Sequence, residues 1–245
     1  MNSCELEAVL VTADPVVVDS VSESLGKLGI NPNVYGDALA AMQTLNTQKT
    51  DAFLVDRELD PEFSILKAMR RSTSSRSAVA FAICSQESST KEAFSVADFV
   101  MDKPLASHRV HRTMKAAYGI MLKERMRYFR HSLRTEATVI DSTYRRFIAQ
   151  TSNISQTGIG LECVAPLLAR QVVQLEFALP DDQDKLSCKA QVIWTAENGK
   201  TGLTFTDMNS SQTERLTEWI ESQFLRRVHP AIALSSSLSS NHAIA

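Results

Sequence analysis

The most constraining feature of this 245-residue chain is a change of periodicity near its middle. In the first half, short apolar runs typical of buried strands alternate with helix-like segments, and Asp37 and Ser88 are placed to cap two of the helices. Strands are expected at residues 6–12, 51–56, 77–84 and 98–102, and helices at residues 15–28, 37–48, 62–71 and 88–95. This alternation predicts a doubly wound α/β domain, in which helices cover both faces of a parallel sheet and a ligand site lies beyond the carboxyl ends of the strands.

The second half carries strands without intervening helices. They are expected at residues 134–141, 145–152, 158–164, 171–179, 186–195 and 201–206. Short strands at this spacing predict a small six-stranded antiparallel β-barrel. A helix follows over residues 212–227, and its apolar face consists of Leu216, Trp219, Ile220 and Phe224. Trp194 and Phe205 are interpreted as core residues of the barrel.

These patterns predict two domains joined by a helix, and the chain is long enough for each domain to bury its own core. The expected boundaries are 1–106 for the α/β domain, 107–129 for the linker helix, 130–228 for the barrel and 229–245 for a disordered tail. Two interpretations of the linker helix stay open. Either its first half packs on the sheet and its second half only connects the domains, or its exposed second half pairs with another copy and forms a homo-oligomer.

Bulk composition excludes several classes of function. The net charge of −2 argues against DNA binding, because a basic surface is needed to displace counterions from phosphates. No apolar run approaches the ~18 residues of a membrane span. Residues 1–7 lack the basic start and apolar core of a secretory signal, so a cytoplasmic location is expected. No metal site is expected either, because the cysteines form no CxxC pair and the histidines are dispersed.

Residues at the expected strand ends of the first half resemble the response-regulator receiver family. Asp56 ends a strand where the family has its phospho-acceptor, and the segment from Ala97 ends in a similar Lys103-Pro104 pair. The resemblance implies a five-stranded parallel sheet and a site formed by Asp56, Lys103 and Asp14. The acidic pair that the family carries after its first strand falls on Thr12 and Ala13, and Val100 stands where the family has a switching aromatic.

These replacements predict a pseudo-receiver. Phosphoryl transfer to a carboxylate requires Mg²⁺ held by several acidic groups, and Thr12 and Ala13 supply none. We therefore expect Asp56, Lys103 and Asp14 to form a vestigial site in which Asp56 pairs with Lys103 and is not phosphorylated at a useful rate.

A cluster of arginines precedes a polar turn in the second half. The arginines are Arg125, Arg127, Arg130 and Arg134, and the turn is Asn153-Ile154-Ser155-Gln156-Thr157-Gly158. A guanidinium lies flat on a purine and can bond two phosphate oxygens or the O6/N7 edge of guanine. An amide, a hydroxyl and a glycine add short polar contacts and allow close approach of the backbone.

Arginines before a strand, followed by Asn-x-Ser-x-x-Gly, resemble the PilZ family of cyclic di-GMP receptors over roughly residues 125–225. The resemblance implies that Asn153, Ser155 and Gly158 bind the ligand together with two arginines four residues apart. Arg130 fits both possible registers. In one register the other position falls on Met126, between Arg125 and Arg127, and in the other register it falls on Arg134.

The sequence therefore predicts a signalling effector, not an enzyme, because no nucleophile, base and orienting group recur together. Its ligand would be cyclic di-GMP, bound at the barrel, and binding would change the arrangement of the domains and the contacts with an unidentified protein partner. A second hypothesis is an interaction module in which both domains are degenerate and no ligand is bound. A third, a regulator driven by phosphorylation, is disfavoured by Thr12 and Ala13.

Overall fold

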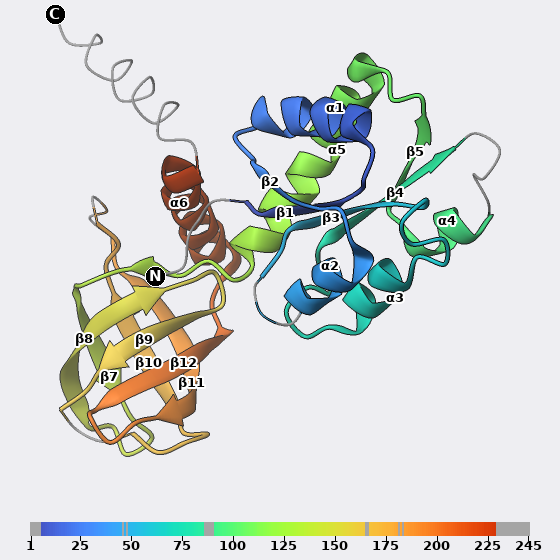
Figure 1. Ribbon diagram of the computed structural model, residues 1–245. Helices are drawn as coiled ribbons and strands as arrows, with labels where there is room; N and C mark the ends of the chain where they lie inside the picture. The colour runs from blue at the N-terminus through green and yellow to red at the C-terminus, as the bar shows by residue number, and fades with distance from the viewer. Residues whose placement is uncertain are drawn as a thin grey trace, which may run out of the picture. The chain divides into compact units, whose positions relative to one another are not determined.

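The computed structural model describes residues 6–45, 47, 49–85, 91–164, 167–180, 182 and 184–228. The chain divides into two compact units, Met1–Met126 and Arg127–Ala245. Figure 1 shows an α/β unit and a barrel unit. Within the described ranges, no helix combines the length and the apolar character that a membrane span requires. The expected cap Ser88 and the expected tail 229–245 lie outside the described residues.

The first unit contains a parallel sheet of five strands among its described residues, in the order β2-β1-β3-β4-β5. The strands are β1 (Ala8–Val11), β2 (Pro32–Tyr35), β3 (Ala52–Asp56), β4 (Val79–Ser85) and β5 (Phe99–Lys103). The helices are α1 (Pro15–Gly26), α2 (Ala38–Thr44), α3 (Ser64–Arg71), α4 (Lys91–Val96) and α5 (Ser107–Met126). This strand order is the one found in receiver and flavodoxin-like folds, and the predicted doubly wound fold is confirmed.

Both faces of this sheet are buried. Successive residues of a strand point to opposite faces, so one strand contributes to two core clusters. In β3, Leu54 belongs to the core cluster that includes residues of α1 and α5, whereas Phe53 and Val55 belong to the cluster with α2 and α3. The short edge strand β2 is only partly buried, so it carries no apolar run, and the sequence analysis did not place it.

Helix α5 lies entirely within the first unit. Its buried side chains Val110, Met114, Ala117 and Met121 recur at steps of three and four and pack in the same core cluster as β1, β3 and β4. The buried stripe therefore continues to Met121, past the middle of the helix.

The second unit is an antiparallel barrel of six strands among its described residues, closed by the pairing of β8 with β9. The strands are β7 (Glu136–Ile140), β8 (Arg146–Ile154), β9 (Gly158–Glu162), β10 (Val172–Phe177), β11 (Leu186–Thr195) and β12 (Lys200–Asp207). A two-residue strand, β6 (His131–Ser132), pairs with the end of β8. The predicted antiparallel barrel is confirmed.

Alternate residues of the strands fill the barrel. Val173, Leu175 and Phe177 of β10 are buried, and the residues between them are more exposed. Helix α6 (Ser210–Val228) follows the last strand and buries Leu216, Ile220 and Phe224, as its apolar spacing predicts. Phe205 stacks against Phe177, with ring centroids 6.0 Å apart.

Asp37 lies at the N-terminus of helix α2 in the first unit. Its carboxylate accepts hydrogen bonds from the backbone N–H groups of Leu39 at 3.2 Å and Ala40 at 3.0 Å, which confirms the predicted N-cap of α2. Asp37→Ala should lower the free energy of unfolding by about 1 kcal/mol, because two N–H groups of the first turn lose their acceptor. Urea denaturation followed by circular dichroism measures this loss. Asp37→Asn keeps an acceptor and is the matched control, and an equal loss in both variants would contradict the capping role.

Candidate functional site

In two strands of the barrel, β8 and β11, the alternation of inward and outward residues shifts near one end of the strand. In β8 the pairing with β9 passes from Thr151–Leu161 to Asn153–Gly160, so Ser152 is an extra residue. In β11 the pairing with β12 passes from Val192–Leu203 to Trp194–Gly202, so Ile193 is extra. An extra residue of this kind is a β-bulge, and it moves the residues beyond it to the opposite face of the strand.

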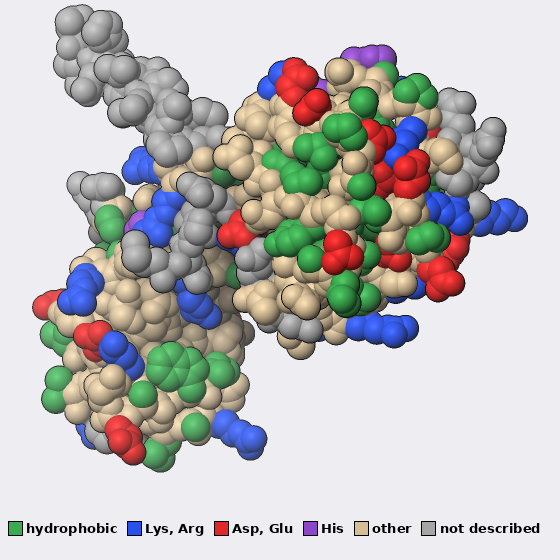
Figure 2. Space-filling model, in the orientation of Figure 1, with side chains coloured by type: hydrophobic (Ala, Val, Ile, Leu, Met, Phe, Trp, Pro, Cys, Tyr) green, Lys and Arg blue, Asp and Glu red, His purple; other side chains and the backbone are tan. Residues whose placement is uncertain are grey.

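The second bulge overturns the interpretation of Trp194 as a core residue. Leu186, Cys188, Ala190 and Val192 alternate inward along β11, and unbroken alternation would bury Trp194 next. Because Ile193 is the extra residue, Trp194 faces outward instead, with 51% of its surface exposed. Figure 2 shows hydrophobic side chains on the surface of the barrel, with basic and acidic side chains around them.

The two bulges place four residues in one row across neighbouring strands. Asn153 of β8 pairs with Gly160 of β9, Gly160 pairs with Gly202 of β12, and Gly202 pairs with Trp194 of β11. A Cβ atom at Gly160 would lie 2.6 Å from the Asn153 side-chain nitrogen, and one at Gly202 would overlap the indole of Trp194. The amide and the indole thus lie over two glycines that leave the barrel wall bare between them.

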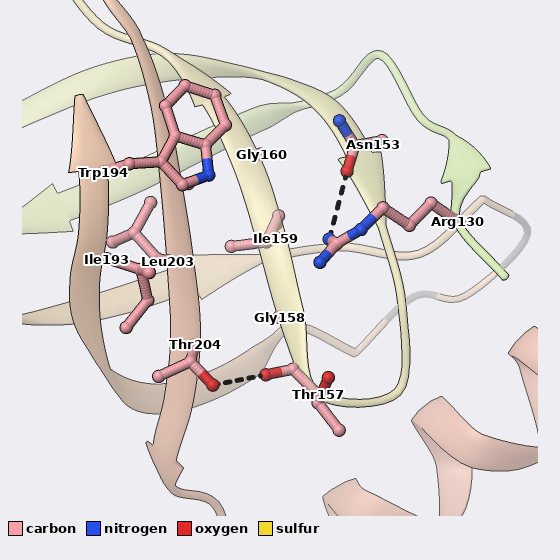
Figure 3. A pocket seen from close by; sticks show the side chains of 11 residues that line it. Arg130, Asn153, Thr157, Gly158, Ile159, Gly160, Ile193, Trp194, Leu203 and Thr204 are labelled. Atoms are coloured by element: carbon pink, nitrogen blue, oxygen red, sulfur yellow. Dashed lines mark hydrogen bonds between the residues drawn. The ribbon is translucent and has the colours of Figure 1, made fainter. Parts of the chain in front are cut away.

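This row forms the floor of a pocket of about 360 Å³. Arg130 and Asn153 lie on one side of β9 and Trp194 lies on the other (Figure 3). The guanidinium of Arg130 donates a long hydrogen bond, 3.5 Å, to Oδ1 of Asn153. The remaining lining residues are Thr157, Gly158, Ile159, Ile193, Leu203 and Thr204. This volume is within the range of about 300–1,000 Å³ that is typical of small-molecule sites.

The turn between β8 and β9 is held by Ser155. Its hydroxyl donates to the carbonyl of Gly158 at 3.2 Å and accepts from the N–H of Thr157 at 3.4 Å, and its side chain is buried. The carbonyl of Thr157 accepts from the Thr204 hydroxyl at 3.0 Å, which fixes the turn to β12 (Figure 3). Ser155 is outside the lining of the pocket, whereas Gly158 is part of it.

The arginines singled out in the sequence do not all meet at this pocket. Arg130 lines it, and Arg127 and Arg134 belong to the same unit but are not among its lining residues. Arg125 lies in the last turn of α5, where its guanidinium is 3.5 Å from the buried carboxylate of Asp51. Sequence reasoning placed Trp194 in the core and did not single out Gly160 or Gly202, because the strand pairing that brings these three residues to the pocket is not visible in the sequence.

A second polar cluster lies at the carboxyl ends of the strands in the first unit. The ammonium of Lys103 lies 2.8 Å from Asp56, 3.0 Å from Glu58 and 3.3 Å from Asp14. Thr12, which stands at one of the acidic positions of receiver domains, donates its hydroxyl to Asp56 at 2.7 Å. The structure thus brings Asp56, Lys103 and Asp14 together.

Lys103 offsets part of the negative charge of the three carboxylates in this cluster. Burial alone would lower the pKa of Lys103, but its hydrogen bonds to Asp56, Glu58 and Asp14 outweigh burial and raise the pKa above its ordinary value. The pKa of Asp14 is lowered, since its hydrogen bonds to the Val16 N–H and to Lys103 outweigh the opposing effect of burial. Among the described residues, no three His, Cys, Asp or Glu side chains are grouped so that they could hold a metal ion.

Comparison with known proteins identifies the barrel. Residues 124–222 match the family model of the PilZ domain, so the chain contains a PilZ domain. The chain is also similar to the PilZ domain of CeSA from a cellulose-synthesizing bacterium, with 19% identity, a TM-score of 0.33, and coverage of 39% of this chain and 97% of that one. The search of curated proteins found no match.

Solved receiver domains are similar to the first unit. The receiver domain of a sensor histidine kinase from Pseudomonas aeruginosa is 20% identical, with a TM-score of 0.42 and coverage of 47% of this chain and 98% of that one. A receiver domain from Methylobacillus flagellatus is 19% identical, with a TM-score of 0.41 and coverage of 46% of this chain and 98% of that one.

Lys103→Met should destabilise the first unit by roughly 3 kcal/mol at pH 7, because three carboxylates lose their shared cation and Asp56 is buried. The raised pKa of Lys103 means that its contribution is fully present below the ordinary Lys pKa and is lost only at higher pH. Protonation of the carboxylates relieves their repulsion in the variant, so its deficit should shrink as the pH falls from 7 towards 4.

Urea denaturation across this pH range measures the deficit. Lys67→Met is the control, because the Lys67–Glu92 pair is 2.8 Å long but exposed, and its loss should cost at most about 1 kcal/mol. A deficit for Lys103→Met that does not change with pH would contradict the electrostatic role.

Proposed function

Because residues 124–222 form a PilZ domain, we propose that the protein is a signalling effector that binds cyclic di-GMP in the pocket of the barrel. The observation that carries this proposal is the placement of the Arg130 guanidinium beside Asn153, at the edge of the bare glycine floor. An arginine, an amide and an aromatic face around one hollow suit a ligand with phosphates and a flat base. The proposal involves no catalytic step.

Each lining group has a distinct role in the proposed complex. Arg130 bonds either a phosphate or the O6/N7 edge of guanine, and Asn153 adds an amide contact beside it. The half-exposed indole of Trp194 offers a face on which a purine stacks. Gly160 and Gly202 let the side chains of Asn153 and Trp194 lie close over the barrel wall. Gly158 allows close approach of the Leu203 backbone, and Ser155 holds the turn in shape.

Magnitudes favour a complex of useful affinity. A micromolar dissociation constant corresponds to about 8 kcal/mol. Each charge-assisted hydrogen bond contributes about 1.5–3 kcal/mol, and each stacked base contributes about 1–3 kcal/mol. Arg130, a second arginine, Asn153 and Trp194 together contribute about 5.5–12 kcal/mol before ordering costs, so a micromolar complex requires contacts near the upper end of this range.

Three arginines are candidates for the second arginine that contacts the ligand. Arg127 and Arg134 flank Arg130 and belong to the same unit as the pocket. Arg125 lies against Asp51 in the first unit, and its use would require this contact to break. We therefore favour Arg127 or Arg134.

Arg130→Ala should weaken cyclic di-GMP binding at least tenfold, which corresponds to about 1.4 kcal/mol, because the ligand loses its charged contact in the pocket. Isothermal titration calorimetry measures the affinity. Arg146→Ala is the matched control, since this barrel arginine pairs with Glu176 at 3.3 Å and does not line the pocket. Equal affinity of Arg130→Ala and the wild type would remove Arg130 from the site.

The same titration separates the two leading hypotheses. Heat of binding with cyclic di-GMP, and none with cyclic di-AMP, supports a guanine-specific receptor. No heat with either nucleotide would favour the alternative, a module that contacts protein partners without a ligand.

Signalling requires that the ligand favour one arrangement of the domains over another, since equal affinity for both would shift nothing. The boundary between the two units falls at Met126 and Arg127, shortly before Arg130. Ligand contacts at Arg127 and Arg130 would therefore restrain the chain where the units are connected, and this restraint is the proposed route to altered contacts with a protein partner.

The first unit acts in this proposal as a pseudo-receiver. The ammonium of Lys103 and the hydroxyl of Thr12 already occupy the Asp56 carboxylate, and Thr12 supplies no charge for Mg²⁺. Incubation with acetyl phosphate and Mg²⁺ should leave the intact mass of the protein unchanged. The double variant Thr12→Asp, Ala13→Asp is the matched control, because it restores the acidic pair. A gain of one phosphoryl group on Asp56 of the wild type would refute the pseudo-receiver.

A further inference from the structure

We propose that helix α6 positions Arg130 for its ligand and responds when the ligand is captured, an inference that rests on the function proposed above. The segment that carries Arg130 has two sides. Arg130 itself lines the pocket, whereas its neighbours Phe129 and His131 contact α6. The ligand site and the helix are thus separated by one residue of backbone.

Ring contacts define the side that faces α6. The ring of Phe129 meets Phe224 edge-on with centroids 5.2 Å apart, and the imidazole of His131 meets Trp219 edge-on at 5.1 Å. The guanidinium of Arg227 lies over the ring of Phe129 at 5.5 Å. Such edge-to-face pairs contribute about 0.5–1.5 kcal/mol each beyond the burial of their surface.

His131 takes part in this contact as an uncharged ring. Burial lowers the pKa of His131, and the nearby Arg227 lowers it further, so the imidazole is neutral at pH 7. Its buried Nδ1 has no hydrogen-bond partner among the described residues. Packing against Trp219, rather than a directed polar bond, therefore sets the position of the His131 ring.

The same segment is fixed to the other half of the pocket. In β6, His131 pairs with Ile154 and Ser132 pairs with Asn153. The backbone beside Arg130 is thus hydrogen-bonded to the strand that carries Asn153, while its side chains pack on α6. A shift of the Arg130 backbone towards a ligand must therefore either move the rings of Phe129 and His131 along α6 or move α6 with them.

Coupling of this kind is reciprocal for binding free energies. If docked α6 holds Arg130 where it binds the ligand, then ligand capture must stabilise the docked helix, and loosening α6 must weaken ligand capture. Trp219 and Phe224 are accordingly positioning residues, because they act through Phe129 and His131 and do not line the pocket. The exposed residues near the C-terminal end of α6, Leu225, Arg226 and Arg227, form the surface whose position the ligand would change.

Fluorine NMR of the full-length protein tests the response of α6. The chain has two tryptophans, one in the pocket and one on α6, so 5-fluorotryptophan labelling gives one ¹⁹F resonance for each. The variant Trp219→Phe assigns them. Saturation with cyclic di-GMP should shift the resonance of Trp194, which meets the ligand, and also that of Trp219, which does not.

Calorimetry tests the reverse direction. Trp219→Ala should weaken cyclic di-GMP binding about fivefold or more, the lower end of typical coupling, and Trp219→Phe should largely restore it because an aromatic ring is retained. Leu225→Ala, a change at an exposed position of the same helix, is the control. In the Arg130→Ala background, Trp219→Ala should have little further effect, whereas general loss of structure would weaken binding in both backgrounds.

The outcomes separate this inference from the function on which it rests. The role of α6 would be overturned, and the proposed function kept, by the following results. Cyclic di-GMP binds and shifts the Trp194 resonance, but the Trp219 resonance does not move and Trp219→Ala binds with unchanged affinity. An equal loss on Trp219→Ala in both backgrounds would also overturn it. No heat with the wild type would overturn the proposed function and this inference with it.

Discussion

The pocket of the barrel depends on two extra residues, Ser152 in β8 and Ile193 in β11. Each bulge moves the following residue from the inner to the outer face, so Asn153 and Trp194 come to lie over the paired glycines Gly160 and Gly202. Without these bulges, strict alternation would point the amide and the indole into the core. An unpaired amide there would cost about 1–3 kcal/mol. The bulges thus place an amide and an indole over a hollow on the outer face of the barrel.

Much of the fold follows from periodicity, and the failures have physical causes. Continuous apolar runs identified β1, β3 and β4, which are buried on both faces, whereas β2 is a short edge strand with partly exposed residues and no such run. In the barrel, period-two alternation placed the strands but also placed Trp194 in the core, because a bulge leaves no sign in the hydrophobic pattern of one strand. Only the pairing with β12 reveals it.

The candidate site was predictable where chemistry is encoded locally. Asn153, Ser155 and Gly158 lie within six residues of one another, and their resemblance to the Asn-x-Ser-x-x-Gly motif suggested a site. The arginines precede that turn by many residues, and their contacts depend on where α5 ends. Because α5 continues to Met126, Arg125 is part of a helix that packs on the first sheet, and its charge lies against Asp51. No sequence spacing distinguishes this arginine from Arg130.

Each unit has a basic side chain in a polar cluster, Lys103 in the first unit and Arg130 in the second. The two side chains differ in how strongly they are already engaged by neighbouring groups. Lys103 is largely buried and shared among three carboxylates, so a phosphoryl group would have to displace contacts already made. Arg130 is exposed and makes one long hydrogen bond to a neutral amide, which a phosphate would replace with a stronger, charge-assisted contact. The charges therefore favour anion binding beside Arg130 in the second unit over anion binding beside Lys103 in the first. Since the backbone beside Arg130 is held by rings on α6, an anion that draws this arginine inward acts on a packed element rather than on a loose loop.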